Sequence, residues 1–253
     1  MTKSITFVGN GKMALALAKG LCETYAIEVI GRSMAAMERF EQSLKVPLKK
    51  TLYADADITN KTVILCVKPS NLEEVAPYLQ GNAQTLYSVL AGTPLTALKI
   101  IPARAYCRAM PNLAAEAGAS MTSLVGDSDV SLQAVALFET IGTTLWLGSE
   151  KELDIATALA GSGPAYLALI AEALTDGAVR EGLKRDDAMI LMRGLFNGFG
   201  KLIQTLHPAI LKDNVMSPGG TTAAGYGAME KGKVRDGCME AIRAAHERAK
   251  GMK

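Results

Sequence analysis

The chain has few of the residue types that carry metal or nucleophilic chemistry. Only four cysteines and two histidines occur in 253 residues, and the cysteines form no CxxC pair and no zinc-ligand spacing. We therefore expect no metal site, and we interpret the thiols as reduced and mostly buried, as in a cytoplasmic protein. The net charge is only +2, and no basic cluster is interleaved with aromatic residues. These observations argue against nucleic acid as a partner.

Long uninterrupted apolar runs are also scarce. Residues 155–171 carry no charge, but Gly161-Ser162-Gly163-Pro164 interrupts them, and we expect Pro164 in the first turn of the helix that follows. The run therefore falls short of a membrane span. We predict a buried helix at this position, with a second subunit covering part of it. The chain enters an apolar strand almost at once, so we expect no secretory signal and a cytoplasmic location.

Two patterns divide the chain. From residue 1 to about 148, short apolar runs such as Val63–Val67 and Thr85–Leu90 alternate with helical stretches, which indicates a parallel sheet with helices on both faces. Beyond Gly148, Ala, Leu, Met and Gly recur at helical spacing. We therefore predict an α/β protein. A Rossmann-type doubly wound parallel sheet forms residues 1–148, and an all-α helix bundle for dimerisation and substrate binding forms residues 149–253.

The first predicted strand runs into a glycine turn. Ile5–Val8 is followed by Gly-Asn-Gly-Lys-Met-Ala and then by an Ala- and Leu-rich helix. In a dinucleotide site the first glycine permits the tight turn and the second lets the backbone approach the pyrophosphate. Ala14 stands where many such motifs have a third glycine and still permits close helix–strand packing. The residues that we expect to bind the cofactor here are Gly9, Asn10, Gly11, Lys12 and Met13.

The end of the second strand indicates which dinucleotide binds. Ile27–Gly31 is followed by Arg32 and Ser33, where NAD-preferring sites usually have an acidic residue for the ribose 2′-hydroxyl. Glu28 lies too early in the strand to reach the ribose easily. A guanidinium and a hydroxyl suit a 2′-phosphate, so we predict NADPH, with NADH as a weaker alternative. The other interpretation is that Arg32 is a solvated turn residue that stacks loosely on adenine.

A second glycine turn lies near the C-terminal end. The run Ser217-Pro218-Gly219-Gly220-Thr221-Thr222 predicts a turn that opens a helix. The unpaired N–H groups and the dipole of a helix N-terminus favour an anion, and a side chain at residue 219 or 220 would crowd a bound carboxylate or phosphate. The alternatives are that Pro-Gly-Gly is plain turn punctuation and that Thr222 is an ordinary helix-capping threonine.

These motifs, taken in order along nearly the whole chain, resemble the pyrroline-5-carboxylate reductase family. The specific part is the combination of Gly161–Tyr166 (GSGPAY), Leu211–Val215 (LKDNV) and Ser217–Thr222 (SPGGTT). The resemblance implies NADPH-dependent reduction of 1-pyrroline-5-carboxylate, a cyclic imine with a carboxylate, to L-proline in the last step of proline biosynthesis. It also implies a homo-oligomer, at least a dimer, with a decamer as the larger assembly.

The resemblance further implies roles for particular residues. The backbone of Gly219, Gly220 and Thr221 would hold the substrate carboxylate, and Met110 would line the substrate. Thr222 would be the catalytic residue, orienting the ring nitrogen rather than protonating it, because a threonine hydroxyl is a very poor acid. Further cofactor-binding positions are Val67, Lys68, Pro69, Ala91, Gly92, Asn112 and Asn214. Lys68 has an alternative interpretation as an ordinary surface lysine.

Two positions depart from the family pattern near the expected nicotinamide. Leu113-Ala114 stands where the family usually has Thr-Pro, and Leu90 stands where a small residue is common. Two other functions therefore stay open. One is a related two-domain NADPH enzyme, such as a 3-hydroxyacid dehydrogenase, although no lysine of the helical half stands out as catalytic. The other is a catalytically silent NADPH sensor, which would have no use for a substrate anion turn.

Overall fold

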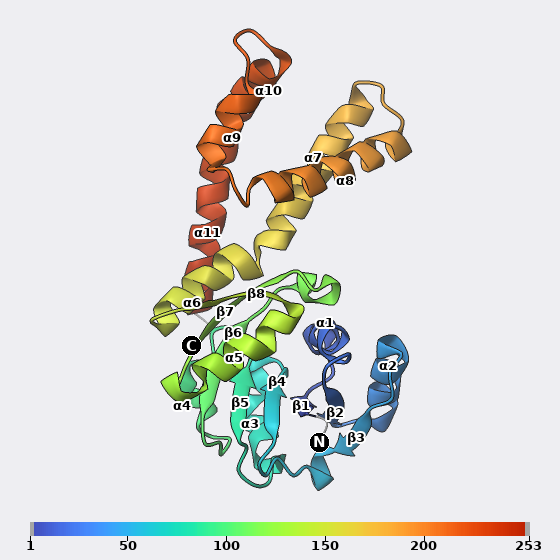
Figure 1. The fold of residues 1–253 in the computed structure, drawn as a ribbon, viewed down its shortest axis with the longest axis vertical. Helices are drawn as coiled ribbons and strands as arrows, with labels where there is room; N and C mark the ends of the chain where they lie inside the picture. The colour runs from blue at the N-terminus through green and yellow to red at the C-terminus, as the bar shows by residue number, and fades with distance from the viewer. Residues whose placement is uncertain (1–2, 251–253) are drawn as a thin grey trace. The chain divides into compact units, whose positions relative to one another are not determined.

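A computed structural model describes residues 3–250, and its N-terminal part is built on one sheet of eight strands (Figure 1). The strand order is β3-β2-β1-β4-β5-β6-β7-β8. The strands are β1 (Ser4–Val8), β2 (Ala26–Gly31), β3 (Lys49–Leu52), β4 (Thr62–Leu65), β5 (Thr85–Ser88), β6 (Tyr106–Met110), β7 (Ser120–Gly126) and β8 (Gly142–Trp146). All pairs from β3 to β6 are parallel. The predicted doubly wound parallel sheet is confirmed.

The far edge of the sheet differs from an all-parallel arrangement. β7 pairs antiparallel with β6, and β8 then runs parallel to β7. Only residues 111–119 connect β6 to β7. A parallel crossover needs a dozen or more residues, so this short connection returns the chain antiparallel.

Alternating side chains along the strands create two apolar cores, one on each face of the sheet. Phe7 and Ile64 belong to the core that includes residues of α1, α2 and α5, whereas Val8 and Leu65 belong to the core that includes residues of α3 and α4. These helices are α1 (Lys12–Leu21), α2 (Met34–Leu44), α3 (Leu72–Val75), α4 (Leu95–Leu98) and α5 (Ser131–Phe138). Short 3-10 turns are η1 (Tyr53–Asp55), η2 (Pro69–Asn71), η3 (Ala76–Tyr78), η4 (Leu113–Ala117), η5 (Ser128–Val130) and η6 (Glu139–Ile141).

The chain divides into two compact units. Of the described residues, 3–162 and 243–250 belong to unit 1, and 163–242 belong to unit 2. The helices after the sheet are α6 (Glu150–Ala156), α7 (Gly163–Arg180), α8 (Arg185–Leu202), α9 (Pro208–Val215), α10 (Thr221–Lys231) and α11 (Val234–Lys250). The all-α character of the C-terminal half is confirmed, and the domain boundary between residues 148 and 149 stays a prediction.

The helical stretch Glu150–Arg180 is divided near the predicted interruption at Gly161–Pro164: α6 ends at Ala156, Ser162 is a turn residue, and α7 begins at Gly163. A π-helical turn at Thr157–Gly161 joins the two segments, and the Ser162 N–H donates to the Thr157 carbonyl over 3.0 Å. A proline inside a regular α-helix clashes with the preceding turn and removes one hydrogen bond. Pro164 lies in the first turn of α7, as predicted, where its missing N–H is harmless.

The apolar surface of this helix is largely exposed in the single chain. Its length and composition would allow it to cross a membrane, a test that core helices of soluble proteins also pass. Only 17% of its most apolar window is buried, and Leu167 and Leu169 are 50% and 65% exposed. The single chain does not bury this helix by itself, so the predicted cover by a second subunit stays a prediction. Such a face needs cover from another molecule.

A buried carboxylate connects three strands of the sheet and the residue that precedes β4. Glu28 of β2 accepts hydrogen bonds from the hydroxyls of Thr6 on β1 and Thr51 on β3, and it pairs with Lys49 and Lys61 at 2.9 and 2.8 Å. Burial by itself raises the pKa of Glu28, but hydrogen bonds from Lys61, Lys49 and Thr6 outweigh it and lower the pKa overall. The carboxylate is thus ionised and occupied by contacts within the sheet.

We expect Glu28→Gln to destabilise the fold at neutral pH by about 1–3 kcal/mol, because the lysines lose their charged partner. The pKa of the folded state lies below the value of about 4.3 for an unfolded glutamate. This stabilisation is therefore present above that value and is lost as the pH falls through the folded pKa. Urea denaturation at neutral and acidic pH, with exposed Glu38→Gln as a control, measures it. A wild-type advantage that did not shrink in acid would contradict the assignment.

Candidate functional site

The first glycine turn lies where the strand order reverses. β1 stands between β2 and β4, and sheets of this topology bind ligands at the carboxyl ends beside that point. Gly9 has φ +101°, and a Cβ there would approach the backbone of Cys66, at the exit of β4, to 3.0 Å. Its N–H donates to the Ile30 carbonyl of β2 over 2.9 Å. Residue 9 must therefore be glycine, as the tight-turn interpretation requires.

The second glycine faces open space. A Cβ at Gly11 would meet no atom of the chain within 4 Å. Gly11 is the N-cap of α1, and no side chain caps that helix. The N–H groups of Lys12 and Met13 therefore have no intrahelical acceptor, which is the arrangement that binds anions. Ala14 is fully buried against the sheet, as predicted.

A hollow of about 260 Å³ opens between the starts of α1 and α2. Its lining residues are Asn10, Gly11, Lys12, Leu15, Ala36, Arg39, Phe40 and Ser43. Three of these are predicted cofactor residues. The sequence analysis missed Arg39, which adds a second basic side chain beside Lys12. The spacing of residues 36, 39, 40 and 43 places them on one helical face and was the available signal.

The end of β2 brings Arg32 and Ser33 to the start of α2. Ser33 is the N-cap, and its hydroxyl accepts the Ala36 N–H over 3.4 Å. Burial raises the pKa of Tyr53, and the charge of exposed Arg32 lowers it in part, so the two side chains interact. Tyr53 stacks on Tyr78 with ring centroids 5.6 Å apart. Arg32 itself is exposed to solvent.

Two further predicted cofactor segments follow β4 and β5. Val67, Lys68 and Pro69 follow β4 directly, and Lys68 is exposed. Ala91 and Gly92 follow β5, where Gly92 is buried with φ +69°. The parallel pairing of these strands puts both segments at the same edge of the sheet as the glycine turn.

The segment after β6 is held by the protein itself. Met110 is 5% exposed and packs in a small core with Val125 and Leu153. The Asn112 side chain accepts the Ala114 N–H and donates to the Ala160 carbonyl, both over 3.0 Å. In a regular helix residue 164 would donate to that carbonyl, but Pro164 has no N–H. Asn112 therefore supplies the missing donor, a structural role that the sequence analysis did not foresee.

Unit 2 contains the predicted anion turn. The Gly220 N–H donates to the Ser217 carbonyl over 3.0 Å, and Gly219 has φ +70°. Pro218 and Gly219 thus occupy the central positions of a type II turn. A Cβ at Gly220 would lie 2.4 Å from the Ser217 hydroxyl oxygen, so a side chain there would displace that hydroxyl. The helix α10 begins at Thr221, which confirms that the turn opens a helix.

Thr222 does not cap the helix. Gly220 is the N-cap and no side chain caps α10, so Thr221 and Thr222 are its first two residues, both exposed. The interpretation of Thr222 as a helix-capping threonine is therefore wrong. The first helical bond runs from the Ala224 N–H to the Gly220 carbonyl, which leaves the N–H groups before it for another acceptor. Asn214 is exposed on α9.

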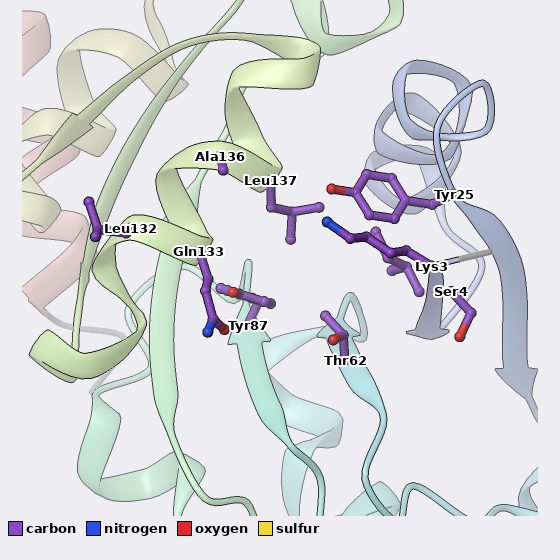
Figure 2. A pocket seen from close by; sticks show the side chains of 10 residues that line it. Lys3, Ser4, Tyr25, Thr62, Tyr87, Leu132, Gln133, Ala136 and Leu137 are labelled. Carbon is purple, nitrogen blue, oxygen red and sulfur yellow. The ribbon is translucent and has the colours of Figure 1, made fainter. Parts of the chain in front are cut away.

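No other part of the described chain adds to these residues. A hollow of about 610 Å³ lies at the amino ends of the strands, where Thr62 and Tyr87 face Gln133 and Leu137 of α5 (Figure 2). None of the predicted site residues lines it. Between residues 3 and 250, no group of three or more His, Cys, Asp and Glu side chains is placed to hold a metal ion.

The sheet order from β3 to β6, with an uncapped glycine turn at its reversal point, defines a dinucleotide-binding protein of the Rossmann class. Comparison with known families agrees. A model described as NADP oxidoreductase, coenzyme F420-dependent, matches residues 4–92. A model described as pyrroline-5-carboxylate reductase dimerisation matches residues 150–252.

Curated relatives match from end to end. A pyrroline-5-carboxylate reductase from Synechocystis is 37% identical and one from Helicobacter pylori is 33% identical, each with 98% of both chains covered. The solved reductase from Streptococcus pyogenes has a TM-score of 0.86 and 30% identity, with 98% of each chain covered. The Plasmodium falciparum enzyme, solved with NADP bound, has a TM-score of 0.82 and 28% identity, and the match covers 99% of this chain and 98% of that one. The chain belongs to the pyrroline-5-carboxylate reductase family.

The two glycines of the first turn should differ in their effect on stability. We expect Gly9→Ala to lower the free energy of unfolding by about 1–3 kcal/mol or more, because it combines a strained φ with a backbone clash. Gly11→Ala should leave it nearly unchanged, since its φ of −80° suits any residue and its surroundings are open. Thermal unfolding without ligand compares the two variants. Equal losses would show that the turn does not have this geometry.

Proposed function

We propose that this protein uses NADPH to reduce 1-pyrroline-5-carboxylate to L-proline, the last step of proline biosynthesis. The observation that carries the proposal is that the stretches matched by an NADP oxidoreductase model and by the reductase dimerisation model each include one of the glycine turns. The stretch 4–92 contains the turn after β1, and the stretch 150–252 contains the turn before α10. A silent NADPH sensor is less well supported, because the exposed start of α10 suits a substrate anion.

Residues of unit 1 fit NADPH. The open space at Gly11 and the uncapped start of α1 suit the pyrophosphate, and exposed Arg32, with the neighbouring Ser33, suits the 2′-phosphate. When bound, NADPH supplies a hydride from C4 of its nicotinamide. We assign further cofactor contacts to Asn10, Lys12, Met13, Val67, Lys68, Pro69, Ala91, Gly92, Asn112 and Asn214.

The start of α10 fits the substrate carboxylate. The backbone N–H groups of Thr221 and Thr222, which follow the N-cap Gly220, have no intrahelical acceptor, and the helix dipole favours negative charge there. The turn at Gly219-Gly220 keeps side chains away from this position. The hydroxyl of Thr222 would hydrogen-bond the ring nitrogen and orient the electrophilic carbon, and the proton on that nitrogen comes with the imine or from water. Met110 would line the substrate.

We also propose a cytoplasmic homo-oligomer that contains at least a dimer, with a decamer as the complete assembly. The match of residues 150–252 to the dimerisation model supports a dimer. The exposed apolar residues of α7 are those that a second copy would cover. In this proposal neither a membrane nor a nucleic acid is a partner. Light scattering on the purified full chain measures the number of subunits.

The reaction is tested by NADPH oxidation in the presence of 1-pyrroline-5-carboxylate. We expect Thr222→Ala to lower kcat/KM by about a hundredfold, or about 3 kcal/mol, with little loss of stability because the side chain is exposed. Thr222→Ser should retain most activity, and exposed Thr205→Ala is the matched control. Full activity in Thr222→Ala would overturn the orienting role. Wild-type protein that binds NADPH but does not turn over would overturn the proposed reaction.

The cofactor preference is tested separately at Arg32. We expect Arg32→Ala to weaken NADPH binding by roughly tenfold or more, because the 2′-phosphate loses its charge-assisted hydrogen bonds, and to leave NADH binding unchanged. The NADPH affinity of Arg32→Lys should lie between those of the wild type and Arg32→Ala, because lysine keeps the charge but lacks the planar guanidinium. Fluorescence titration with each nucleotide gives the dissociation constants. Unchanged NADPH affinity in Arg32→Ala would favour the interpretation of Arg32 as a solvated turn residue.

A further inference from the structure

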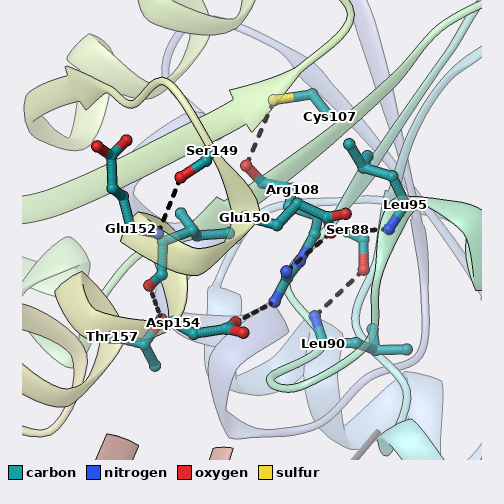
Figure 3. Close-up of polar contacts among 11 residues, drawn as sticks. Ser88, Leu90, Leu95, Cys107, Arg108, Ser149, Glu150, Glu152, Asp154 and Thr157 are labelled. Carbon is teal, nitrogen blue, oxygen red and sulfur yellow. Dashed lines mark hydrogen bonds and ion pairs between the residues drawn. The ribbon is translucent and has the colours of Figure 1, made fainter. Parts of the chain in front are cut away.

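A fully buried arginine stands at the centre of a polar cluster beside the predicted nicotinamide segments. Arg108 of β6 is 0% exposed and is the largest of the fully buried side chains among the described residues. Its Nη1 donates to Glu150 Oε1 over 2.9 Å, and its Nη2 donates to Asp154 Oδ1 over 3.0 Å (Figure 3). Asp154 is 2% exposed. A buried ion pair of this kind is weak evidence of a stabilising role, because removing two charges from water is expensive.

The cluster is not arranged for greatest stability. The Nε of Arg108 is buried and has no hydrogen-bond partner in the described chain. An apolar set of similar size would pack β6 against α6 without leaving a donor unpaired. Charge-assisted hydrogen bonds fix the orientation of the groups that they join, whereas apolar packing does not.

One carboxylate of the cluster reaches the segment after β5. Glu150 Oε1 accepts not only Arg108 Nη1 but also the backbone N–H of Leu95, over 2.8 Å. Leu95 begins α4, three residues after Gly92. Arg108 therefore holds the Glu150 carboxylate in the place where it secures the end of the Ala91–Gly92 segment (Figure 3).

The other carboxylate belongs to the helix that secures the segment after β6. Asp154 lies six residues before Ala160, whose carbonyl accepts the Asn112 side chain. Arg108 and Asn112 stand at the middle and the exit of the same strand. The chain from Arg108 to Asn112 is thus fastened to the helix at two points, with Met110 between them.

We propose that Arg108, Glu150 and Asp154 position the Ala91–Gly92 and Met110–Asn112 segments for the nicotinamide end of NADPH. This inference rests on the proposed function. Arg108 touches neither cofactor nor substrate and is a positioning residue. The cluster sets one end of the cofactor site and leaves the adenosine end, at Gly11 and Arg32, to the first turn and β2.

The test compares NADPH with 2′,5′-ADP, a fragment that contains the adenosine end and no nicotinamide. In Glu150→Ala we expect the dissociation constant for NADPH to rise about tenfold while that for 2′,5′-ADP stays unchanged. Glu150→Gln keeps an oxygen for the Leu95 N–H and should restore most of the NADPH affinity. The matched control is Glu152→Ala in the same helical turn, because Glu152 accepts only a local N–H, that of Gly148. It should bind both nucleotides like the wild type.

A second variant separates positioning from packing. Arg108→Met combined with Asp154→Leu replaces the buried pair by apolar groups and should unfold within a few degrees of the wild type. We expect its kcat/KM with NADPH to fall at least tenfold. Wild-type kcat/KM in this variant, or equal weakening of NADPH and 2′,5′-ADP in Glu150→Ala, would overturn the proposal. If the double variant does not fold, the nucleotide binding of Glu150→Ala and Glu150→Gln decides.

The same measurements separate the two proposals. Nucleotide binding is read without turnover, so the positioning role is decided even if the wild type does not reduce 1-pyrroline-5-carboxylate. In that case the proposed reaction fails while a selective loss of NADPH binding in Glu150→Ala still supports the cluster. If the wild type is active and Glu150→Ala binds both nucleotides like the wild type, the proposed reaction stands and the positioning role of the cluster fails.

Discussion

The close approach of the exits of β1 and β4 is the constraint on which the site depends. A side chain at residue 9 would meet the backbone of Cys66 at 3.0 Å, so the chain can leave β1 there only through a glycine with positive φ. The reversal of strand order at this point sends the connections after β1 and β4 to opposite faces of the sheet. The start of α1 then borders open space with its N–H groups unpaired. Fold and anion site thus have one geometric origin.

Local chemistry allowed the sequence to predict the turns, and contacts between distant residues explain what it did not predict. Gly9 and Gly219 have positive φ values that few other residues adopt, so their positions indicate structure directly. The antiparallel β7 depends on the length of one connection. The π turn was not predicted, because the side chain that donates to its Ala160 carbonyl is that of Asn112, 48 positions earlier in the chain. Arg108 in Tyr106–Met110 gives no sign in the sequence that its partners lie more than 40 residues later.

Glu28 and Arg108, both buried in unit 1, have different consequences. Glu28 has partners on the neighbouring strands, two of them lysines with exposed or half-exposed side chains, and it stabilises the sheet itself. The Glu28 carboxylate is bound to these partners within the sheet and does not reach the end of β2. That end instead presents the cation Arg32, in the place where an acidic residue would select a ribose hydroxyl. Arg108 instead joins β6 to α6, so its charge organises connections rather than strands. The acidic group is structural, and in the proposed function the exposed Arg32 selects the ligand.

The hydrogen bond from Asn112 to Ala160 bears on how this chain can be divided. The segment matched by the dimerisation model begins at residue 150, yet residues 150–162 belong to unit 1 and are bonded to β6 and its exit. A chimera that joins the helical half of one relative to the nucleotide-binding half of another at residue 150 would separate Ala160 from its donor and Asp154 from Arg108. A chimera should therefore take one group of residues from the same parent: Arg108, Asn112, Glu150, Asp154 and Pro164. In this chain a boundary that keeps this group together lies after Pro164.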